Sequence, residues 1–479
     1  MTNKNKMILT SIGSGSSYLP DIAEQLIERR DTLQIEEWRL EDIDAYRLHC
    51  TGNYVKKMFE DAGMKTKITM IHADIEEACK NADFVMTTVR PGMSEARELD
   101  ETIPFKHGLI GQETTAPGGM IMGLKTIPVL LEVAHAIEKV SKPNCYLINL
   151  ANPSGMIGQA LSMYSNVKFG CLCNGPTVIR KAMNQIYTAE GYAKEDIFTL
   201  VMGLNHIIYC KVWVEGKEVT DEAFEKLLVW SADHLPALRK EFVTEPLEKF
   251  IGWIPMGPYL DFYYDFPGNF SDLKHYGSNH WAQMKATVQK NVGDVIDDIP
   301  APKEDATRAE CVRIIEKRTF ELYEKLDPRA YKLACNTRGG KGYGEAGITL
   351  MNAIWNNTNE IFSPDVCSMG SMQGFNPNDV ITTTSLVNAQ GIHPICFPKM
   401  EGHQMAIFYA AKEYEKLASR AAVTGSYHDA LEALVANPLV NSYYNAKSCL
   451  NELLLAEKQW LPQFSESIEA LEKGEEPKN

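Results

Sequence analysis

The chain lacks the features of an exported, disulfide-bonded or membrane-spanning protein. Its 11 cysteines among 479 residues are scattered and odd in number, which does not favour a disulfide framework. The apolar run that follows the N-terminal MTNKNK is shorter than a signal-peptide core and leads into a glycine turn. No stretch is expected to supply the roughly 20 apolar residues that span a bilayer. These absences predict a cytoplasmic protein with no membrane partner.

Positive charge is also scarce. The chain has 48 Lys and Arg against 63 Asp and Glu, a net charge of −15. An acidic surface repels nucleic acids and acidic membranes, so neither is expected as a partner. A small anionic substrate stays possible, because basic groups in a cleft can outweigh a distant net charge. The proportions of 44% hydrophobic and 23% charged residues are typical of a globular protein, and the length predicts more than one domain.

Short apolar runs alternate with amphipathic segments over the first 200 residues. The expected strands are Met7–Ile12, Glu37–Leu40, Ile68–Ile71, Phe84–Val89, Tyr146–Leu150 and Phe169–Leu172. The expected helices include Pro20–Arg30, Tyr46–Ala62 and Ile121–Val140, which carry apolar residues at helical spacing. This alternation predicts the α/β class with a Rossmann-like, doubly wound parallel sheet.

The alternation is lost after about residue 200. A strand-like segment at 203–219 leads into a helix-rich region that ends in long helices near 403–424 and 427–456. We therefore expect two domains: residues 1–200 as a Rossmann-like domain, and 201–479 as an α+β domain with C-terminal helices.

The first expected strand ends in a glycine turn, Gly13-Ser14-Gly15-Ser16, before a helix. Two glycines allow backbone amides to approach a pyrophosphate at the helix N-terminus, although the third glycine of the usual fingerprint is missing and an ordinary tight turn is the alternative. The second strand ends in Asp42, where a carboxylate is expected to bind a ribose hydroxyl. An acid there favours NAD over NADP, whose extra phosphate it repels.

Polar side chains follow the later strands, at the edge where open α/β sheets bind ligands. They are Arg90, Arg97, Glu113, Asn149, Asn152, Cys173, Asn174 and His206. A lone cysteine or histidine is usually a packing residue. Together, Cys173 and His206 could supply a thiolate and an imidazole to a divalent metal, with positions left for substrate hydroxyls. To share one ion, their sulfur and nitrogen must lie within about 6 Å.

Several motifs resemble those of glycoside hydrolase family 4, in particular its 6-phospho-β-glucosidases. They are GSGS-x-x-x-P, R-x-G-x-x-x-x-R-x-x-D-E-x-I-P, G-x-I-G-Q-E-T-x-x-P-G-G, N-P-S-G, C-N-x-P and G-L-N-H. The match is dense over residues 7–210 and thin from Tyr259 onward. The combination of the third, fifth and sixth motifs in this order is specific to the family.

The resemblance implies a glycosidase that uses NAD and a divalent metal, usually Mn²⁺, in place of two opposed carboxylates. NAD⁺ takes a hydride from C3 of the sugar, and a metal on Cys173 and His206 polarises the ketone. Tyr259 matches the base that removes the C2 proton, with Tyr263 as the fallback. The aglycone leaves, water adds, and the hydride returns to C3. A neighbouring cation must stabilise the phenolate, since a free tyrosine has a pKa of about 10.

The resemblance also implies roles for the other strand-end residues. Substrate contacts are expected from Arg90, Arg97, Asn149, Asn152 and Asn174, and Arg97 is expected to bind a phosphate in bidentate fashion. Glu113 is expected to support the metal, to handle a proton, or simply to stabilise its loop. Asparagine at 174 replaces the aspartate of α-specific members and cannot donate a proton, which favours a β-linked substrate. Family members are usually homodimers or homotetramers.

Part of the family pattern is absent. Asp261 stands where phospho-sugar members carry a basic residue, while Arg338 and Lys341 lie in a glycine-rich segment that is either an anion contact or a solvated turn. A 6-phosphate, another anionic group and an unphosphorylated sugar all stay open. Two alternatives also stay open: an NAD-dependent polyol or hydroxy-acid dehydrogenase that releases NADH, and an inactive sugar- or nucleotide-binding regulator.

Overall fold

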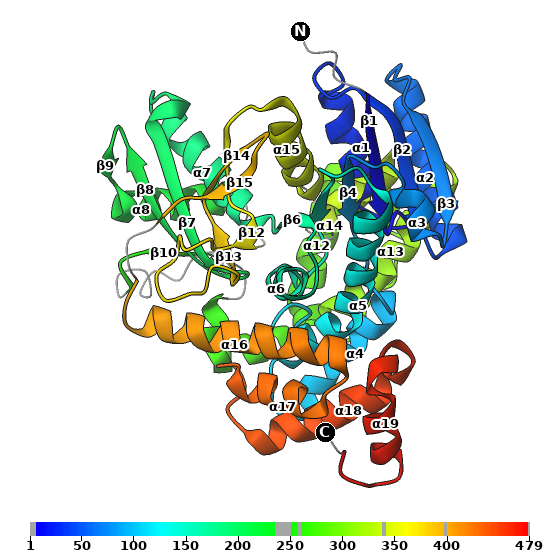
Figure 1. Ribbon diagram of the computed structural model, residues 1–479, viewed down its shortest axis with the longest axis vertical. Coiled ribbons are helices and arrows are strands. Elements are labelled where there is room, and N and C mark those ends of the chain that lie inside the picture. Colours follow the sequence, from blue (N-terminus) through cyan, green and yellow to red (C-terminus); the bar gives the residue numbers. More distant parts are fainter. Residues whose placement is uncertain (1–5, 235–250, 257–259, 338–341, 397–399, 478–479) are drawn as a thin grey trace.

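A twelve-stranded mixed sheet runs through the described part of the chain (Figure 1). The computed structural model describes residues 6–234, 251–256, 260–337, 342–396 and 400–477. The strand order is β10-β8-β7-β13-β12-β6-β5-β4-β1-β2-β3, with β9 beside β8. Helices cover both faces of this sheet.

Six parallel strands form one half of the sheet. They are β1 (Met7–Ile12), β2 (Ile35–Asp42), β3 (Lys67–His72), β4 (Phe84–Thr87), β5 (Tyr146–Asn149) and β6 (Lys168–Cys171). β1 pairs with β2 on one side and with β4 on the other, so the strand order reverses at β1. Open α/β sheets bind ligands at such a switch point. The predicted Rossmann-like parallel sheet is confirmed.

Helices from both ends of the sequence cover this parallel half. α1 (Leu19–Glu28), α2 (Ala45–Asp61) and α15 (Tyr343–Asn356) share an apolar core with one face. The other face packs against α3 (Ile75–Cys79), α5 (Ala116–Val140) and α6 (Ser154–Tyr164), while α4 (Met93–Lys106) lies against α5. Late-sequence α15 therefore completes the N-terminal half by packing against α1.

Helix α5 corrects one expectation from the sequence. Its 25 residues are long and apolar enough to cross a membrane by length and composition, with a mean hydropathy of 1.5 over 18 residues. However, 78% of that window is buried inside the protein, where α5 lies between the sheet and α16 (His403–Thr424). Its composition is that of a core helix.

The antiparallel strands extend the same sheet beyond β6. They are β7 (Ile197–Leu204), β8 (Ile207–Val214), β9 (Lys217–Glu218), β10 (Ile254–Met256), β12 (Asp365–Cys367) and β13 (Val380–Thr383). Asp365 of β12 pairs with Cys171 of β6 and so joins the two halves. A smaller sheet contains β11 (Glu360–Phe362), β14 (Ser385–Asn388) and β15 (Gly391–Pro394). The sheet is continuous across residue 200, and the division into domains there stays a prediction.

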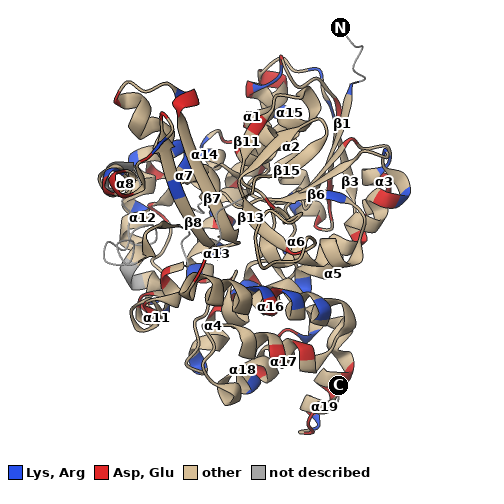
Figure 2. Ribbon diagram, turned by 60° about the vertical axis from the view of Figure 1, so that its left-hand side comes forward, with Lys and Arg blue, Asp and Glu red and all other residues tan. Residues whose placement is uncertain are grey.

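The remaining helices of the described residues follow β6 in the sequence. They are α7 (Gly175–Ala189), α8 (Thr220–His234), α11 (Phe266–Lys274), α12 (Tyr276–Val292), α13 (Arg308–Glu324), α14 (Arg329–Thr337), α17 (Tyr427–Ala436), α18 (Tyr443–Ala456) and α19 (Ser465–Glu472). Short 3₁₀ turns are η1 (Lys194–Asp196), η2 (Leu260–Tyr263), η3 (Asp294–Ile296), η4 (Lys458–Trp460) and η5 (Pro462–Phe464). Acidic and basic residues are interspersed over the outer helices (Figure 2).

The predicted helix at 427–456 is wrong in one respect, because the structure divides it into α17 and α18. Pro438 lies between them, and its ring and missing N–H prevent the helix from continuing. The Asn437 side chain accepts a hydrogen bond from the Leu439 amide at 2.9 Å and so stabilises the turn.

Candidate active site

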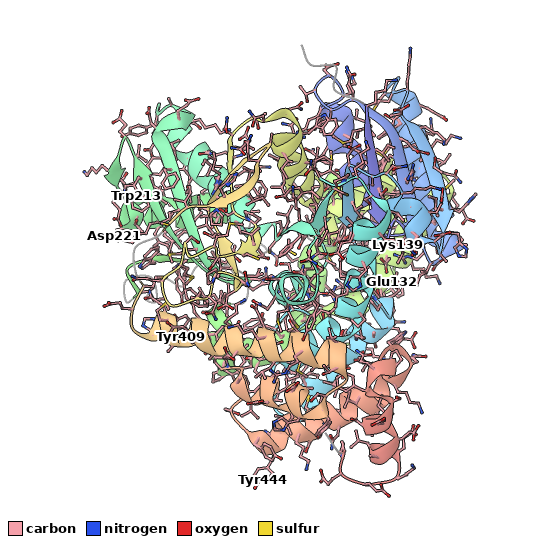
Figure 3. The ribbon with its side chains drawn as sticks, viewed as in Figure 1. Glu132, Lys139, Trp213, Asp221, Tyr409 and Tyr444 are labelled. Carbon is pink, nitrogen blue, oxygen red and sulfur yellow. The ribbon has the colours of Figure 1, made fainter. Side chains whose placement is uncertain are left out.

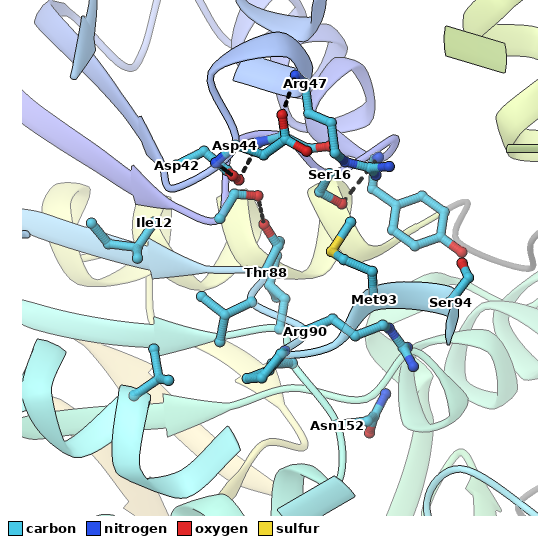
Figure 4. A pocket seen from close by; sticks show the side chains of 18 of the residues that line it. Ile12, Ser16, Asp42, Asp44, Arg47, Thr88, Arg90, Met93, Ser94 and Asn152 are labelled. Atoms are coloured by element: carbon cyan, nitrogen blue, oxygen red, sulfur yellow. Dashed lines mark hydrogen bonds between the residues drawn. The ribbon is translucent and has the colours of Figure 1, made fainter. Parts of the chain in front are cut away.

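A cavity of about 870 Å³ opens at the carboxyl ends of the parallel strands. Its lining includes predicted residues from every part of the proposed site. These are Gly13, Gly15, Ser16, Asp42, Arg90, Arg97, Glu113, Asn152, Asn174 and His206. Asp42 lies on one side of the cavity, and Arg90 and Asn152 lie on the other (Figure 4). The nucleotide and sugar sites predicted from the sequence therefore share one cavity.

Close packing explains both glycines of the turn after β1. Gly13 has a φ of +83°, and a Cβ there would lie 2.9 Å from the backbone of Thr88. A Cβ on Gly15 would lie 2.8 Å from Asp42 Oδ2. The Ser14 hydroxyl donates to the Ser11 carbonyl at 2.8 Å, so this side chain supports the turn and does not line the cavity. The turn thus needs glycine to bring three chain segments together.

Asp42 ties the end of β2 to the glycine turn. Its carboxylate accepts hydrogen bonds from the Gly15 amide at 2.6 Å and from the Asp44 amide at 2.8 Å. Burial raises the pKa of Asp42, and these two hydrogen bonds oppose the rise. Asp44 caps α2 by accepting a bond from the Arg47 amide at 3.0 Å. This arrangement fits a dinucleotide site, with an acid where the ribose is expected.

Glu113 lies between two arginines on the other side of the cavity. Its carboxylate contacts Arg90 Nη1 at 2.6 Å and Arg97 Nη2 at 3.1 Å. Burial alone would raise the pKa of Glu113, but the charges of Arg90 and Arg97 hold it well below its usual range. Glu113 therefore holds the two guanidinium groups beside the cavity. The support of a metal and the proton handling expected of Glu113 stay predictions.

Arg97 is less available to a ligand than the sequence predicted. Its Nε donates to Glu101 Oε1 at 2.8 Å, in addition to its contact with Glu113. The residue is 4% exposed. Its Nε edge is thus hydrogen-bonded to Glu101, whereas Nη2 lies at ion-pair distance from Glu113 and has no hydrogen-bond partner among the described residues. The bidentate phosphate contact expected there stays a prediction.

The two asparagines after β5 have different surroundings. Asn149 is fully buried; its Oδ1 accepts bonds from the Thr87 hydroxyl at 2.9 Å and the Ala151 amide at 3.0 Å. It does not line the cavity, which corrects its expected substrate contact. Asn152 does line it, and donates from Nδ2 to the Tyr343 hydroxyl at 3.1 Å. Its Oδ1 is buried with no hydrogen-bond partner among the described residues.

Cys173 and His206 meet although 33 positions separate them in the sequence. Cys173 precedes α7, and His206 lies in the two-residue turn between β7 and β8 with a φ of +64°. The sulfur lies 3.9 Å from His206 Nε2. Burial raises the pKa of Cys173 to about 12 and lowers that of His206 to about 4.

This donor pair fits a divalent metal. The 3.9 Å separation is shorter than the sum of typical metal–sulfur and metal–nitrogen bonds, about 4.4 Å. The neutral imidazole is the form that binds a metal, and a bound cation would stabilise the thiolate. Among the described residues no group of three or more His, Cys, Asp or Glu side chains is arranged to hold a metal. Such a metal would therefore have coordination positions left for a ligand.

The structure tests the expected tyrosines only in part. Tyr259 lies outside the described residues, as do Arg338 and Lys341. Tyr263 packs in an apolar cluster, its hydroxyl lies 3.3 Å from Thr115 Oγ1, and burial raises its pKa. It does not line the cavity, so its fallback role as a base is corrected.

The cavity lining also contains residues that the sequence analysis did not select, among them Arg47, Arg308, Glu316 and Tyr343. None of these four follows a strand of the parallel sheet directly, so the strand-end rule gave no signal for them. Tyr343 stands just after the glycine-rich segment that was noted only for Arg338 and Lys341.

Comparison with known proteins gives the family. The model of the family 4 glycosyl hydrolases matches residues 8–189, and the model of their C-terminal domain matches residues 201–440. A probable 6-phospho-beta-glucosidase of Bacillus subtilis is 34% identical over 96% of this chain and 99% of its own length. The 6-phospho-beta-glucosidase of Escherichia coli is 29% identical over 98% and 99%.

A solved structure agrees with these relatives. The 6-phospho-beta glucosidase of Thermotoga maritima, with manganese, NAD⁺ and glucose-6-phosphate, has a TM-score of 0.78 and 28% identity over 95% of this chain and 99% of that one. Its metal and nucleotide are the two cofactors predicted from the sequence. The predicted glycosidase class is confirmed, and the chain belongs to glycosyl hydrolase family 4.

Proposed function

We propose that the chain hydrolyses the β-glycosidic bond of a 6-phosphorylated glucoside and needs NAD and a divalent metal such as Mn²⁺. The observation that carries this proposal is the shared cavity, which joins the glycine turn and Asp42 to His206 and the paired arginines. The relatives named as 6-phospho-beta-glucosidases support the substrate class.

Each part of the cavity supports one requirement of this reaction. The turn at Gly13 and Gly15 would hold NAD, and Cys173 with His206 would hold the metal. When bound, NAD supplies a reversible hydride acceptor and the metal supplies Lewis acidity. Asn152 would orient the sugar with its unpartnered Oδ1, because a buried acceptor without a donor is costly. We assign removal of the C2 proton to Tyr259 on the family match alone.

The charges beside Glu113 support an anionic substrate. Burial opposes its ionisation, whereas the positive charges of Arg90, Arg97 and Arg308 lower the pKa of this carboxyl. Glu101 pairs with Arg97. The guanidinium groups of these three arginines therefore outnumber the two carboxylates, Glu113 and Glu101, and leave a net positive charge. Arg308 lines this cavity and also an adjoining cavity of about 210 Å³. We therefore assign the phosphate contact to Arg308 together with Arg90, since guanidinium groups match phosphate geometry.

Three finer assignments are proposals as well. Asn174 lines the cavity and cannot act as a general acid, which supports a β-linked substrate. All 11 cysteines are free thiols, which supports a reducing cytoplasm. We propose that the protein forms a homodimer or a homotetramer, as the family resemblance implies. Tyr444 on α18 is an exposed aromatic side chain, a residue type that is enriched at protein interfaces (Figure 3).

The decisive experiment supplies nitrophenyl α- and β-glucosides, with and without a 6-phosphate, in deuterated water. With NAD⁺ and Mn²⁺ we expect release of nitrophenol from the β-linked 6-phosphate, deuterium at C2, and no net NADH. Omission of either cofactor should stop the release. Cleavage that needs neither cofactor would exclude this mechanism. Steady accumulation of NADH would indicate the dehydrogenase, and NAD⁺ binding without turnover of any sugar would indicate the regulator.

The substrate charge is tested by Arg308→Gln. The loss of a charge-assisted contact should raise KM for the 6-phosphate by about 10- to 100-fold. The inhibition constant of glucose 6-phosphate, as a competitive inhibitor, should rise by the same factor, while NAD⁺ affinity stays unchanged. Arg313→Gln, on the same helix and with a side chain 54% exposed, is the matched control. If wild type and Arg308→Gln have equal KM values for the 6-phosphate, Arg308 does not contact the substrate.

A further inference from the structure

Arg47 lines the nucleotide side of the cavity, and neighbouring groups of the protein already contact its guanidinium. Its Nε donates to the Gly15 carbonyl at 3.0 Å, and its guanidinium lies over the Phe320 ring at 4.0 Å. Its Nη2 pairs with Glu316 Oε1 at 3.0 Å. Glu316 comes from α13, 269 positions later in the sequence.

Glu316 is fixed by a second contact. Its other carboxylate oxygen accepts a hydrogen bond from the Ser94 hydroxyl at 3.0 Å, and the residue is 7% exposed. Arg47 and Ser94 both line the cavity (Figure 4). The carboxylate therefore bridges α2 and α4 from above the glycine turn, and both of its oxygens are used.

Carboxylates dominate the part of the cavity around Arg47. Glu41, Asp42 and Asp44 belong to the lining together with Arg47, and the charge of Arg47 favours the ionised form of Asp42. Dinucleotide sites distinguish their ligands here: an acid binds the ribose 2′-hydroxyl of NAD, whereas a nearby arginine accepts the 2′-phosphate of NADP. This chain has both an acid and an arginine in the lining.

We propose that Glu316 is a specificity-determining residue that keeps the coenzyme site selective for NAD by occupying Arg47. The ion pair neutralises the guanidinium that would otherwise pair with a 2′-phosphate, and the Glu316 charge adds to the repulsion from Asp42 and Asp44. Coenzyme choice thus depends on a residue of the C-terminal half. The inference rests on the proposed function only in taking NAD as the cofactor.

The test compares equilibrium dissociation constants for NAD⁺ and NADP⁺, measured by calorimetry on the full chain without substrate. For wild type we expect NADP⁺ to bind at least about tenfold more weakly. Glu316→Gln keeps the shape and the acceptor for Ser94 but removes the charge. It should lower the ratio of the two constants, NADP⁺ to NAD⁺, by about tenfold, because a freed guanidinium forms charge-assisted bonds to phosphate.

Two variants show whether Arg47 carries the effect. Adding Arg47→Gln to Glu316→Gln should return the ratio to the wild-type value, since the acceptor of the phosphate is then gone. Glu321→Gln is the charge-matched control: it lies on the same helix and pairs with Arg318 at 3.0 Å on the exposed side. Its ratio should stay unchanged.

The outcomes separate this inference from the proposed function. The inference would be overturned, with the proposed function intact, by either of two results. One is a folded Glu316→Gln variant with the wild-type ratio of NADP⁺ to NAD⁺ dissociation constants. The other is a gain in relative NADP⁺ affinity that persists when Arg47→Gln is added. If Glu316→Gln does not fold, the single variant Arg47→Gln tests the inference instead. Because Arg47 is already occupied in wild type, this variant should change both affinities equally, and a selective loss of NADP⁺ binding would overturn the inference. Wild type that binds neither nucleotide would overturn both proposals.

Discussion

The glycine turn on the nucleotide side of the cavity is held largely by backbone hydrogen bonds and close packing, whereas the side near His206 is held by charged and metal-binding side chains. At the glycine turn, the amides of Gly13 and Ser14 donate to the Glu41 carbonyl at 3.0 and 2.8 Å. At the other side, Arg90, Arg97 and Glu113 form buried ion pairs. The first arrangement depends on where small residues allow segments to meet. The second depends on opposite charges that compensate each other's desolvation.

This difference predicts different responses to mutation. A change on the side near His206 should reduce catalysis while nucleotide binding survives, because its side chains lie away from the glycine turn. A change in the glycine turn should reduce nucleotide affinity and stability together, because the turn is packed against β4 and α2.

The largest effect is expected from Cys173→Ser. A hydroxyl is a poor replacement for a thiolate ligand, so kcat/KM should fall by about 10³-fold or more, the several kcal/mol that a Lewis acid supplies. NAD⁺ affinity should stay within a factor of about two. Kinetics at saturating Mn²⁺ and calorimetric NAD⁺ titration measure the two quantities. Exposed Cys396→Ser serves as the control. If Cys173→Ser lowered NAD⁺ affinity as much as it lowered kcat/KM, the two sides of the cavity would not be independent.

Glu113→Gln should have the next largest effect. It leaves Arg90 and Arg97 without their shared carboxylate, so kcat/KM should fall by about 100-fold and stability by about 3 kcal/mol. Chemical unfolding and steady-state kinetics measure these changes. Asp61→Asn removes the carboxylate from an exposed pair with Lys57 and should change stability by less than about 1 kcal/mol. Similar losses in both variants would show that the Glu113 pairs are no stronger than surface pairs.

Gly13→Ala tests the packing of the turn. The new Cβ would meet the Thr88 backbone in a left-handed conformation, so NAD⁺ affinity should fall by about tenfold and stability by about 2 kcal/mol. Gly63→Ala is the matched control, because Gly63 has a φ of +68° and nothing lies within 4 Å of its Cβ position. Calorimetry and thermal unfolding should show a clearly smaller loss there. Equal losses would assign the effect to backbone conformation alone.

The smallest effect on activity is expected from Glu41→Gln, which changes the pH dependence of stability. Burial, with nearby Asp42, raises the pKa of Glu41 to about 7 from an ordinary value of 4.5. The folded state therefore holds a proton that the unfolded state releases, and stability should decline as the pH rises from 4.5 to 7. Gln resembles the protonated acid, so the variant should be up to about 3 kcal/mol more stable than wild type at pH 8, at about 1.4 kcal/mol per pKa unit, and equal at pH 4. Denaturant unfolding at both values measures this; a variant less stable at pH 8 would contradict it.

Local sequence patterns predicted the parts of the site that are contiguous in the chain. The alternation of strands and helices gave the parallel sheet, and with it the edge where Asp42, Asn152 and Asn174 lie. Cys173 and His206 were paired as possible metal ligands from their residue types and then through the family motifs, and the structure brings them to 3.9 Å. The same strand-end rule was wrong for Asn149, because hydrogen bonds to Thr87 and Ala151 occupy its side chain.

The sequence by itself determined the parallel half of the sheet, the glycine turn and the family, because each depends on residues within one segment and on backbone sterics that act locally. Tertiary structure alone decided that Glu316 occupies Arg47, that Glu113 stays ionised between Arg90 and Arg97, and that α15 completes the N-terminal half. These contacts join segments up to hundreds of residues apart. Their energies depend on burial and on the partner's position, which the folded chain alone supplies.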